Sequence, residues 1–433
     1  MERKFVGKLL EWKNSVERKP LIISGARQVG KTHTMLSFGK AFYRDTVYVN
    51  LEDSRDVQAI FERDLKPERI VRELGAHFGQ RILEGDTLLI FDEIQSCERA
   101  LTSLKYFYEN APQYHVMAAG SLLGVAINRE AHSFPVGKVD RLTMYPMDFE
   151  EFLMAAGKGG LVDLIHEACA EFSPFSLHDS AMDLYRTYLV VGGMPQAVLE
   201  YVNRDFNFVV AAQKNINDAY IADMAKYASP QETTKIMAAW ASIPAQLAKE
   251  NRKFQYKVIK SGARAHEYET PLNWLQFAGI VHKCVRVEGG KMPLSAYTDN
   301  GSFKVYMMDT GLLCAKFGIP ANLVLGGKGF DGFKGALAEN YVCQCLAVNG
   351  IAPFYWSSNG KAELDFVFQD APGNIVPLEV KSADNVRSKR LQRFVQLYNP
   401  AYAIRVSAKN FGYENGIKSV PLYAVGALLQ FCQ

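Results

Sequence analysis

Residues 25–32 constrain the fold of this chain most, because they set two glycines, a lysine and a hydroxyl at fixed spacing. The pattern is G-x-x-x-x-G-K-[ST], whose glycines let the backbone curl until successive N–H groups point at phosphate oxygens. An apolar stretch precedes the loop and a helical pattern follows it, so a helix N-terminus adds its dipole to the anion site. The eight candidate nucleotide-binding residues are Gly25, Ala26, Arg27, Gln28, Val29, Gly30, Lys31 and Thr32.

The first 150 residues alternate short apolar stretches with helical ones, which predicts an α/β domain with a parallel sheet covered by helices. The stretch at 87–91 does not alternate, so we expect it to be buried on both faces. The expected strands are residues 21–24, 46–51, 87–91, 114–119 and 142–145, and the expected helices are residues 31–40, 67–83 and 100–109.

Two acids, Asp92 and Glu93, end the third expected strand. Open parallel sheets bind ligands outside the carboxyl ends of their strands, so we expect these acids beside the phosphate loop. Lys31 would then reach the β- and γ-phosphates of ATP, while Thr32 and Asp92 hold Mg²⁺. We assign Glu93 to orient or deprotonate the attacking water, and Ser121, after the fourth strand, to contact the γ-phosphate or that water.

Hydrolysis often uses an added positive charge, an arginine finger. Three residues could supply it here, and the sequence does not choose among them: Arg129, Lys138 and Arg141.

The charge of the chain is uneven. Its 433 residues predict two to four domains, and a net charge of +3 excludes a uniformly basic coat protein. Residues 231–330 nevertheless hold 13 basic and 7 acidic side chains. We interpret residues 231–290 as a winged-helix unit, with a second helix at 265–280 and a two-strand ribbon after it. Its basic residues, interleaved with Phe254 and Tyr256, are candidates for duplex DNA contact: Lys249, Arg252, Lys253, Lys257, Lys260 and Arg264.

Glu267 and Glu269 in the expected recognition helix would repel phosphates, so a protein partner is the alternative for this segment.

Four residues near the C-terminus form a second candidate site. Asp365 precedes Glu379-x-Lys381 by one expected hairpin, and period-two alternation puts Glu379 and Lys381 on one strand face. Asp365 and Glu379 could chelate Mg²⁺ or Mn²⁺, and Lys381 could orient a water for phosphodiester hydrolysis. The alternative is that these acids are solvated or paired. Basic residues follow that could bind a phosphate backbone: Arg387, Lys389, Arg390 and Arg393.

The order of these motifs, together with FPVGKVDRLTMYPMDFEEF, YLVVGGMPQAV and KVYMMDTGLL, resembles bacterial and archaeal AAA+-like ATPases. Those proteins end in a domain of unknown function that looks like a PD-(D/E)xK nuclease. The resemblance implies an upstream acid at Glu339 and places the Gly192–Pro195 turn near the nucleotide, as the link to a helical lid. The family usually has Gly-Arg where this chain has Gly137-Lys138, which puts a finger role there in doubt.

The pattern of elements along the chain places domain boundaries near residues 150, 230 and 332. Together with the resemblance, it predicts an AAA+-like P-loop core (1–150), a helical lid (151–230), a winged-helix-like domain (231–331) and a restriction-endonuclease-like α/β domain (332–433). AAA+ relatives often form rings, so we expect a homo-oligomer. Neither a signal peptide nor a membrane span is expected, and seven scattered cysteines favour reduced thiols in the cytoplasm.

These observations predict a Mg²⁺-dependent ATPase coupled to a C-terminal nuclease-like domain that acts on DNA. The alternative is a nucleotide-dependent switch that gates a protein partner, with the C-terminal domain as a scaffold that does not cut.

Overall fold

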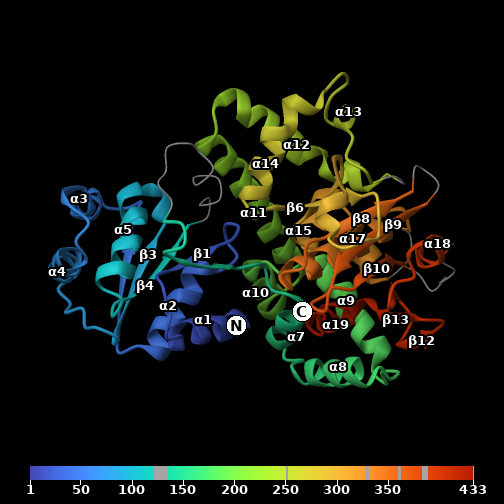
Figure 1. Cartoon of the computed structure of the whole chain (residues 1–433), viewed down its shortest axis with the longest axis horizontal. Helices are drawn as coiled ribbons and strands as arrows, with labels where there is room; N and C mark the ends of the chain where they lie inside the picture. Colours follow the sequence, from blue (N-terminus) through green and yellow to red (C-terminus); the bar gives the residue numbers. More distant parts are fainter. Residues whose placement is uncertain (121–134, 250–251, 327–330, 359–361, 383–388, 433) are drawn as a thin grey trace. The chain divides into compact units, whose positions relative to one another are not determined.

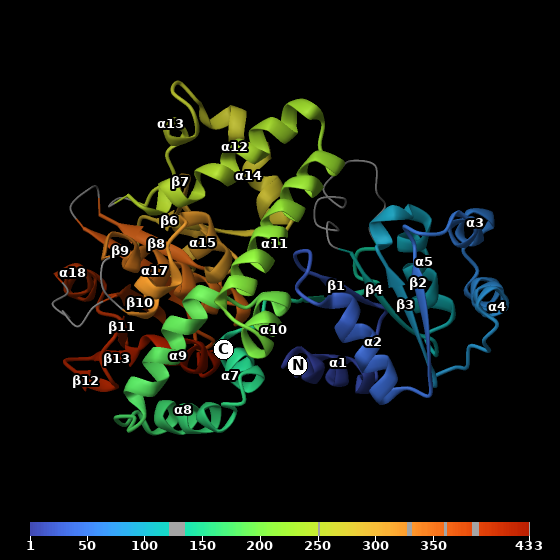
Figure 2. The same cartoon turned by 180° about the vertical axis from the view of Figure 1, so that it is seen from behind.

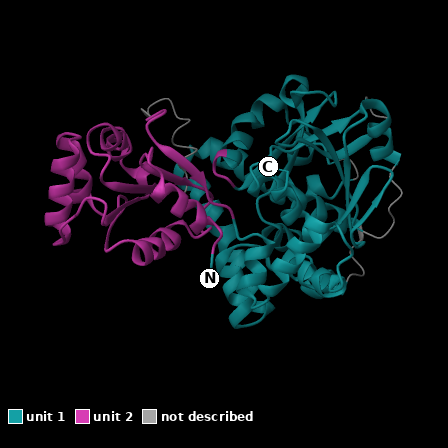
Figure 3. Ribbon diagram, turned by 60° about the horizontal axis from the view of Figure 1, so that its bottom comes forward, with its two compact units in different colours: residues 1–2, 146–276, 280–433 teal, residues 3–145, 277–279 magenta. Residues whose placement is uncertain are grey.

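A computed structural model describes residues 1–120, 135–249, 252–326, 331–358, 362–382 and 389–432. The chain divides into two compact units (Figure 3). The N-terminal unit comprises residues 3–145 and 277–279, and the C-terminal unit comprises residues 1–2, 146–276 and 280–433.

The N-terminal unit is built on a five-stranded parallel sheet in the order β2-β3-β4-β1-β5 (Figure 1). Its elements are α1 (Phe5–Asn14), β1 (Leu21–Ser24), α2 (Lys31–Phe42), β2 (Asp45–Asn50), α3 (Arg55–Arg63), α4 (Pro67–Phe78), β3 (Thr87–Asp92), η1 (Ile94–Ser96), α5 (Glu98–Asn110), β4 (His115–Ala119) and β5 (Asp140–Thr143).

The predicted strands and helices of this unit are confirmed with shifts of a few residues. Helix α4 ends at Phe78 rather than 83, because Gly79 takes a left-handed conformation (φ 62°) and ends the helix. Strand β5 begins two residues before its expected start and pairs in parallel with β1. Helix α3 was not expected; its N-cap is Ser54, whose side chain accepts the Val57 N–H.

Apolar side chains of α3, α4 and α5 pack with the strands into one core on a face of the sheet. Figure 2 shows these helices on one side of the strands and α1 and α2 on the other. Strand β3 is buried at all six positions, as its lack of alternation predicts.

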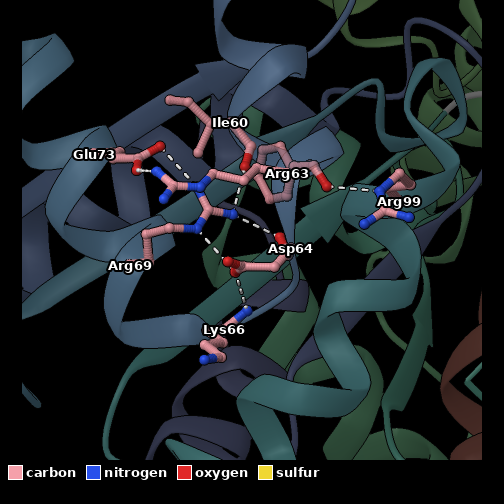
Figure 4. A network of polar contacts seen from close by, with 8 residues as sticks. Ile60, Arg63, Asp64, Lys66, Arg69, Glu73 and Arg99 are labelled. Atoms are coloured by element: carbon pink, nitrogen blue, oxygen red, sulfur yellow. Dashed lines mark hydrogen bonds and ion pairs between the residues drawn. The ribbon is translucent and has the colours of Figure 1, made fainter.

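Arg69 fixes the turn between α3 and α4 (Figure 4). Its side chain is 8% exposed, and its Nε and Nη1 atoms lie 2.8 Å and 2.7 Å from carboxylate oxygens of Asp64 and Glu73. Its Nη2 donates to the backbone carbonyls of Ile60 and Asp64. One buried guanidinium therefore satisfies two carboxylates and two carbonyls at once.

We expect Arg69→Met to lower the free energy of unfolding of the N-terminal unit by about 2–3 kcal/mol, because four acceptors lose their donor. Arg63→Met is the matched control: Arg63 is 74% exposed and 3.9 Å from Glu73, so its loss should change stability by less than about 0.5 kcal/mol. Urea unfolding of the full chain, followed by circular dichroism, measures both. Equal effects of the two substitutions would contradict the role given to Arg69.

The C-terminal unit contains a helical region and a second sheet. The helices that precede the sheet are α7 (Phe149–Ala155), α8 (Gly160–Glu171), α9 (His178–Val191), α10 (Pro195–Asn203), α11 (Phe206–Tyr227), α12 (Pro230–Leu247), α13 (Tyr256–Ile259) and α14 (Ala265–Phe277). The later elements are β6 (Val281–Val287), η2 (Leu294–Tyr297), β7 (Thr298–Met307), α15 (Thr310–Phe317), α16 (Ala321–Leu325), α17 (Asp331–Val348), β8 (Phe354–Ser357), β9 (Glu363–Gln369), β10 (Ile375–Val380), α18 (Lys389–Tyr398), β11 (Ala403–Ser407), β12 (Gly412–Glu414), β13 (Ile417–Pro421), η3 (Leu422–Ala424) and α19 (Val425–Gln430).

The second sheet has eight strands in the order β12-β13-β11-β10-β9-β8-β6-β7. Strands β10, β11 and β13 are parallel, while β9 is antiparallel to both β8 and β10. The ribbon β6–β7, expected as the wing of a winged helix, pairs through β6 with β8 and forms the edge of this sheet. The winged helix is therefore not confirmed.

The Gly192–Pro195 turn is held inside the C-terminal unit. A Cβ atom on Gly193 would lie 1.8 Å from the Met147 carbonyl oxygen, so only glycine fits there. The Met147 N–H donates to the Gly193 carbonyl at 2.7 Å, and the Gly193 N–H donates to Asp309, which is fully buried and caps α15. The turn thus joins the ends of α9 and α15, and its expected position near the nucleotide stays a prediction.

Candidate functional site

The phosphate loop connects β1 to α2, as predicted. Gly25 has φ +142°, and a Cβ atom there would lie 2.2 Å from the Met144 carbonyl oxygen. Gly30 has φ +96° and immediately precedes α2. Both positions require glycine, because other residues rarely adopt these angles. The two fixed glycines of the motif therefore stand at positions where the backbone angles favour glycine.

The remaining loop residues divide between core and surface. Ala26 and Val29 are buried, and Arg27 and Gln28 are exposed. Lys31 is 8% exposed, and its Nζ donates to the Gly25 and Ala26 carbonyls, each at 2.8 Å. The ammonium is thus held inside the curl of the loop, where the lysine of a phosphate loop has to be.

Thr32 and Asp92 meet although 60 residues separate them. The Thr32 hydroxyl donates to Asp92 Oδ2 at 2.6 Å, and the Tyr48 hydroxyl donates to the same oxygen at 3.1 Å. Asp92 is 4% exposed. Burial raises the pKa of Tyr48, and the negative charge of Asp92 raises it further, so the hydroxyl stays a donor. A hydroxyl and a carboxylate oxygen in contact are a donor set that suits Mg²⁺.

Glu93 follows Asp92 in a left-handed conformation (φ 50°), which turns the chain sharply at the end of β3. Its side chain is partly exposed, and its Oε2 accepts a hydrogen bond from the Gln95 side chain. A non-glycine residue in this conformation is uncommon, and such residues are enriched at functional sites. The β3 strand therefore delivers both predicted acids to the same edge of the sheet.

The structure describes only two of the four residues that we expected to assist hydrolysis. Ser121 and Arg129 lie outside the described residues. Lys138 forms an ion pair with Glu109 at 3.0 Å within its own unit, and Arg141 is exposed on β5. No finger is assigned from these contacts.

The second candidate site lies where β9 and β10 separate. Their ladder runs from Gln369 opposite Ile375 to Phe366 opposite Leu378. Beyond the Phe366–Leu378 pair, the Val380 N–H donates to Oδ2 of Asp365 at 2.8 Å. A side-chain acceptor thus takes the place of a backbone carbonyl at this end of the ladder. The hairpin therefore brings Asp365 to the strand that carries Glu379, as the sequence predicts.

Every acid of this site already has a partner in the protein. Glu379 is 1% exposed at its side chain, and its Oε1 lies 2.9 Å from Lys381 Nζ. Glu339 on α17 accepts the Tyr306 hydroxyl at 3.0 Å and forms an ion pair with Arg252. A Cβ atom on Gly335 would lie 2.8 Å from the Arg252 guanidinium, so glycine makes room for this pair.

Burial and nearby charges perturb the acids of this cluster. Burial raises the pKa of Glu339 to about 7, and the charge of Asp365 adds to the shift, while Arg252 and Lys304 oppose it. Burial also raises the pKa of Glu379, and the neighbouring Lys381 opposes the shift. Carboxyl groups perturbed in this way are typical of functional sites and of buried ion networks alike.

Two members of the cluster were not predicted. Lys304 on β7 has no exposed surface and lies 2.8 Å from Glu363 on β9. Burial lowers the pKa of Lys304, but the nearby carboxylates outweigh burial and raise it overall. The sequence does contain a signal for this pair, because Lys304 is a single charge inside the apolar run Phe303–Met308. A lysine in such a run is expected to be buried, and a buried lysine needs an acid partner.

The expected basic face around residues 249–264 is smaller than predicted. Arg252 turns inward to Glu339, and Phe254 is 5% exposed and stacks on Phe303. The aromatic residue therefore belongs to the core, where its large apolar ring is more stable than in water. The basic residues of this set that stay exposed are Lys257, Lys260 and Arg264.

The two sites differ in how they suit a metal ion. In the described ranges, no three His, Cys, Asp or Glu side chains meet where they could hold a metal. Mg²⁺ needs only one or two carboxylates, since water and phosphate supply its other ligands. Asp92 with Thr32 meets this need directly. Asp365 and Glu379 would have to bind Mg²⁺ together, and the neighbouring cationic side chains already neutralise their negative charge.

Comparison with known families divides the chain into three parts. Residues 17–153 match the model of an AAA domain. Residues 182–323 and 334–425 match two domains of unknown function, DUF8612 and DUF4143. No curated protein matches the chain. Among the helices of the described ranges, none has the length and hydropathy needed to cross a bilayer.

Several solved structures are similar to the chain. The Walker-type ATPase PABY2304 of Pyrococcus abyssi shares 15% identity over 73% of this chain and 95% of that one, with a TM-score of 0.43. The Aeropyrum pernix ORC1 protein in complex with DNA shares 13% identity over 76% and 92%, with a TM-score of 0.28. The Thermotoga maritima RuvB Holliday junction branch migration motor shares 13% identity over 65% and 89%, with a TM-score of 0.27. At these TM-scores the similarity does not bear on function.

The domain match covers the phosphate loop, Asp92 and Glu93, and it agrees with the parallel sheet that positions them. Residues 17–153 of this chain therefore form an AAA-type domain.

Proposed function

We propose that this chain binds ATP with Mg²⁺ between residues 25–32 and Asp92–Glu93, hydrolyses it, and uses turnover to move its units relative to one another. The observation that carries the proposal is the 2.6 Å contact between Thr32 and Asp92, because it joins the loop to the acid-bearing strand. Mg²⁺, when bound, neutralises charge on the β- and γ-phosphates.

The residues of the loop perform the remaining work. Lys31 exchanges the Gly25 and Ala26 carbonyls for phosphate oxygens, and the loop N–H groups and the N-terminus of α2 support the same charge. Glu93 orients the attacking water and accepts its proton. Ser121 is proposed to contact the γ-phosphate or that water.

The test is ATP hydrolysis by the purified protein with and without duplex DNA, alongside Glu93→Gln. We expect turnover that Glu93→Gln lowers by at least about 100-fold while ATP binding remains, because the substitution keeps the shape and removes the base. Turnover that survives in Glu93→Gln would contradict the assignment of Glu93. Stimulation by DNA would support action on DNA, and indifference to DNA would favour a protein partner.

A second function is supported by the separation of β9 from β10. We propose that the C-terminal domain has a PD-(D/E)xK-like fold and cleaves DNA at Asp365, Glu379 and Lys381, with Glu339 as the upstream acid. Asp365 and Glu379 would hold Mg²⁺, and Lys381 would orient water against the phosphate. Exposed basic residues would bind the DNA backbone: Lys257, Lys260, Arg264, Lys389, Arg390 and Arg393.

Plasmid nicking in Mg²⁺ or Mn²⁺ tests this second function. We expect nicking that Asp365→Ala and Lys381→Ala abolish and that Lys31→Ala retains, because the two sites use different residues. If both C-terminal variants nick as well as the parent, the nuclease assignment fails. The C-terminal domain is then the scaffold of a nucleotide-dependent switch for a protein partner.

The setting of the protein is also a proposal. We place it in the cytoplasm, because all seven cysteines are buried and none is in a disulfide. We propose a homo-oligomer in which a neighbouring subunit supplies the charge that assists hydrolysis.

A further inference from the structure

Tyr48 on β2 contributes a side chain to the phosphate site that belongs neither to the loop nor to the strand with the two acids. Its hydroxyl donates to Asp92 Oδ2 at 3.1 Å, the same oxygen that accepts the Thr32 hydroxyl at 2.6 Å. The contact joins residues 44 positions apart in the chain. The pairing of strands in the sheet therefore makes this contact, and the motif at residues 25–32 does not include it.

The alternation of side chains along β2 explains why Tyr48 reaches this site. Strands β2 and β3 are neighbours and run parallel. Val47 and Val49 pack into the core that α3, α4 and α5 share with the sheet, so Tyr48 is on the opposite face. Helix α2, whose first turn carries Thr32, covers that second face (Figure 2). The Tyr48 hydroxyl thus lies on the same side of the sheet as the residue that it helps to hold near Mg²⁺.

The Tyr48 hydroxyl is one of three donors that hold the Asp92 carboxylate. Oδ1 accepts the Glu93 N–H at 3.0 Å, while Oδ2 accepts the hydroxyls of Tyr48 and Thr32. Asp92 is 4% exposed, so protein donors have to replace the water that would otherwise solvate this charge. Thr32 is assigned to the metal ion itself, whereas Tyr48 acts on the carboxylate.

The orientation of Asp92 matters because the other acids nearby do not converge with it. The charges of Asp92, Asp53 and Glu93 all act on the Tyr48 hydroxyl. Among the residues that the structure describes, these acids do not form a group that could hold a metal ion together. Mg²⁺ at this site therefore depends on a single protein carboxylate, and Mg²⁺ demands nearly ideal octahedral geometry from its ligands. A small rotation of that carboxylate would weaken binding of the ion.

We propose that Tyr48 is a positioning residue for Mg²⁺, because its hydroxyl fixes the Asp92 carboxylate in the orientation that the ion requires. This inference rests on the binding of ATP with Mg²⁺ proposed above. Removing an outer partner of a ligating group usually costs about 10- to 100-fold in metal affinity. The contact is 3.1 Å long and Tyr48 is partly exposed, so Tyr48→Phe belongs at the lower end of this range.

Calorimetric titration of the full chain with a nonhydrolysable ATP analogue, in Mg²⁺ and in EDTA, tests the proposal. The factor by which Mg²⁺ tightens binding reports how strongly the protein–nucleotide complex holds the ion, without any turnover. We expect Tyr48→Phe to lower this factor by about tenfold and to change binding in EDTA by less than about twofold. A purely structural defect would instead weaken binding in both conditions alike.

Two further variants make the test specific. Tyr43→Phe is the matched control, because it also removes one hydroxyl from the N-terminal unit. The partner of the Tyr43 hydroxyl is His115 Nδ1, 2.7 Å away at the start of β4, so the Mg²⁺ factor should stay unchanged. In an Asp92→Asn background, Tyr48→Phe should lower the factor by less than about a further twofold, since the hydroxyl acts through that carboxylate.

A Mg²⁺ factor within twofold of the parent in Tyr48→Phe would overturn the proposal. A larger factor would overturn it as well, because the hydroxyl would then compete with Mg²⁺ for Asp92. If Asp92→Asn itself leaves the factor unchanged, the proposed place of Mg²⁺ fails, and this inference fails with it. A loss in Asp92→Asn without a loss in Tyr48→Phe overturns the role of Tyr48 alone.

Discussion

Lys31→Ala should lower ATP turnover by about 100- to 1,000-fold, the loss expected when one preorganised donor to a reacting phosphate is removed. The side chain is 8% exposed and its ammonium is already inside the loop, held by the Gly25 and Ala26 carbonyls. A water molecule that fills the space left by the lysine carries no charge, so it does not replace the ammonium. The loss is therefore expected in the binding of the β- and γ-phosphates as well as in turnover.

Two comparisons make this prediction specific. Lys40→Ala removes an exposed lysine from the same helix and should change turnover by less than about twofold, because exposed charges contribute little at a distance. Lys31→Arg keeps the charge, but its larger planar head does not fit between the two carbonyls, so activity should not return. Turnover of Lys31→Ala within threefold of the parent would exclude the loop as the site of hydrolysis.

Lys304→Met should destabilise the C-terminal unit by about 3–5 kcal/mol at pH 8, the usual result of removing one partner from a buried ion pair. Lys304 has no exposed surface, and its Nζ lies 2.8 Å from Glu363. Its positive charge also acts on Glu339 and Asp365. Methionine keeps most of the volume, so the loss reports the charge and not a cavity.

The deficit of Lys304→Met should shrink as the pH falls. In the parent, the pKa of Glu339 is raised to about 7, above its ordinary value of 4.5. The folded chain therefore binds a proton that the unfolded chain has released between these values, and folding stability falls as the pH rises through this window. Lys304 lowers the pKa of Glu339, so in Lys304→Met this acid holds its proton more tightly, and protonation offsets more of the lost charge at pH 5.5 than at pH 8.

Urea unfolding at pH 5.5 and pH 8 measures this difference. Lys257→Met, an exposed lysine of the same unit, is the control and should have no effect at either pH. A deficit of Lys304→Met that is the same at both pH values would show that the acids of the cluster do not depend on Lys304. A deficit below about 1 kcal/mol at pH 8 would show that the charge is not buried in solution.

The sequence alone predicted the five strands of the N-terminal sheet, three of its helices and the glycine loop between β1 and α2. The reason is that these features depend on local rules: unbroken apolar runs form strands buried on both faces, and Gly25 and Gly30 occupy angles that need glycine. Helix α3 was missed because it is short and its start depends on a single cap at Ser54.

The fold of the C-terminal half was harder to predict from the sequence, because its key contacts join residues that are far apart in the chain. The pattern of acids around Asp365 and Glu379 predicted that a hairpin would bring them together, and the structure shows this. It did not show that Arg252 would turn inward to Glu339, 87 residues away, or that the β6–β7 ribbon would join the sheet of β8–β13. Spacing along the chain holds no information about such distant partners.

The sequence by itself therefore determined that this protein has a glycine loop between a strand and a helix, and that two acids follow a neighbouring strand, because short-range backbone geometry dictates both. Only the tertiary structure decided which charges meet: Thr32 with Asp92, Lys304 with Glu363, and Arg252 with Glu339. A buried charge has to find an opposite charge within a few ångströms, and the folding of the whole unit determines which one it finds.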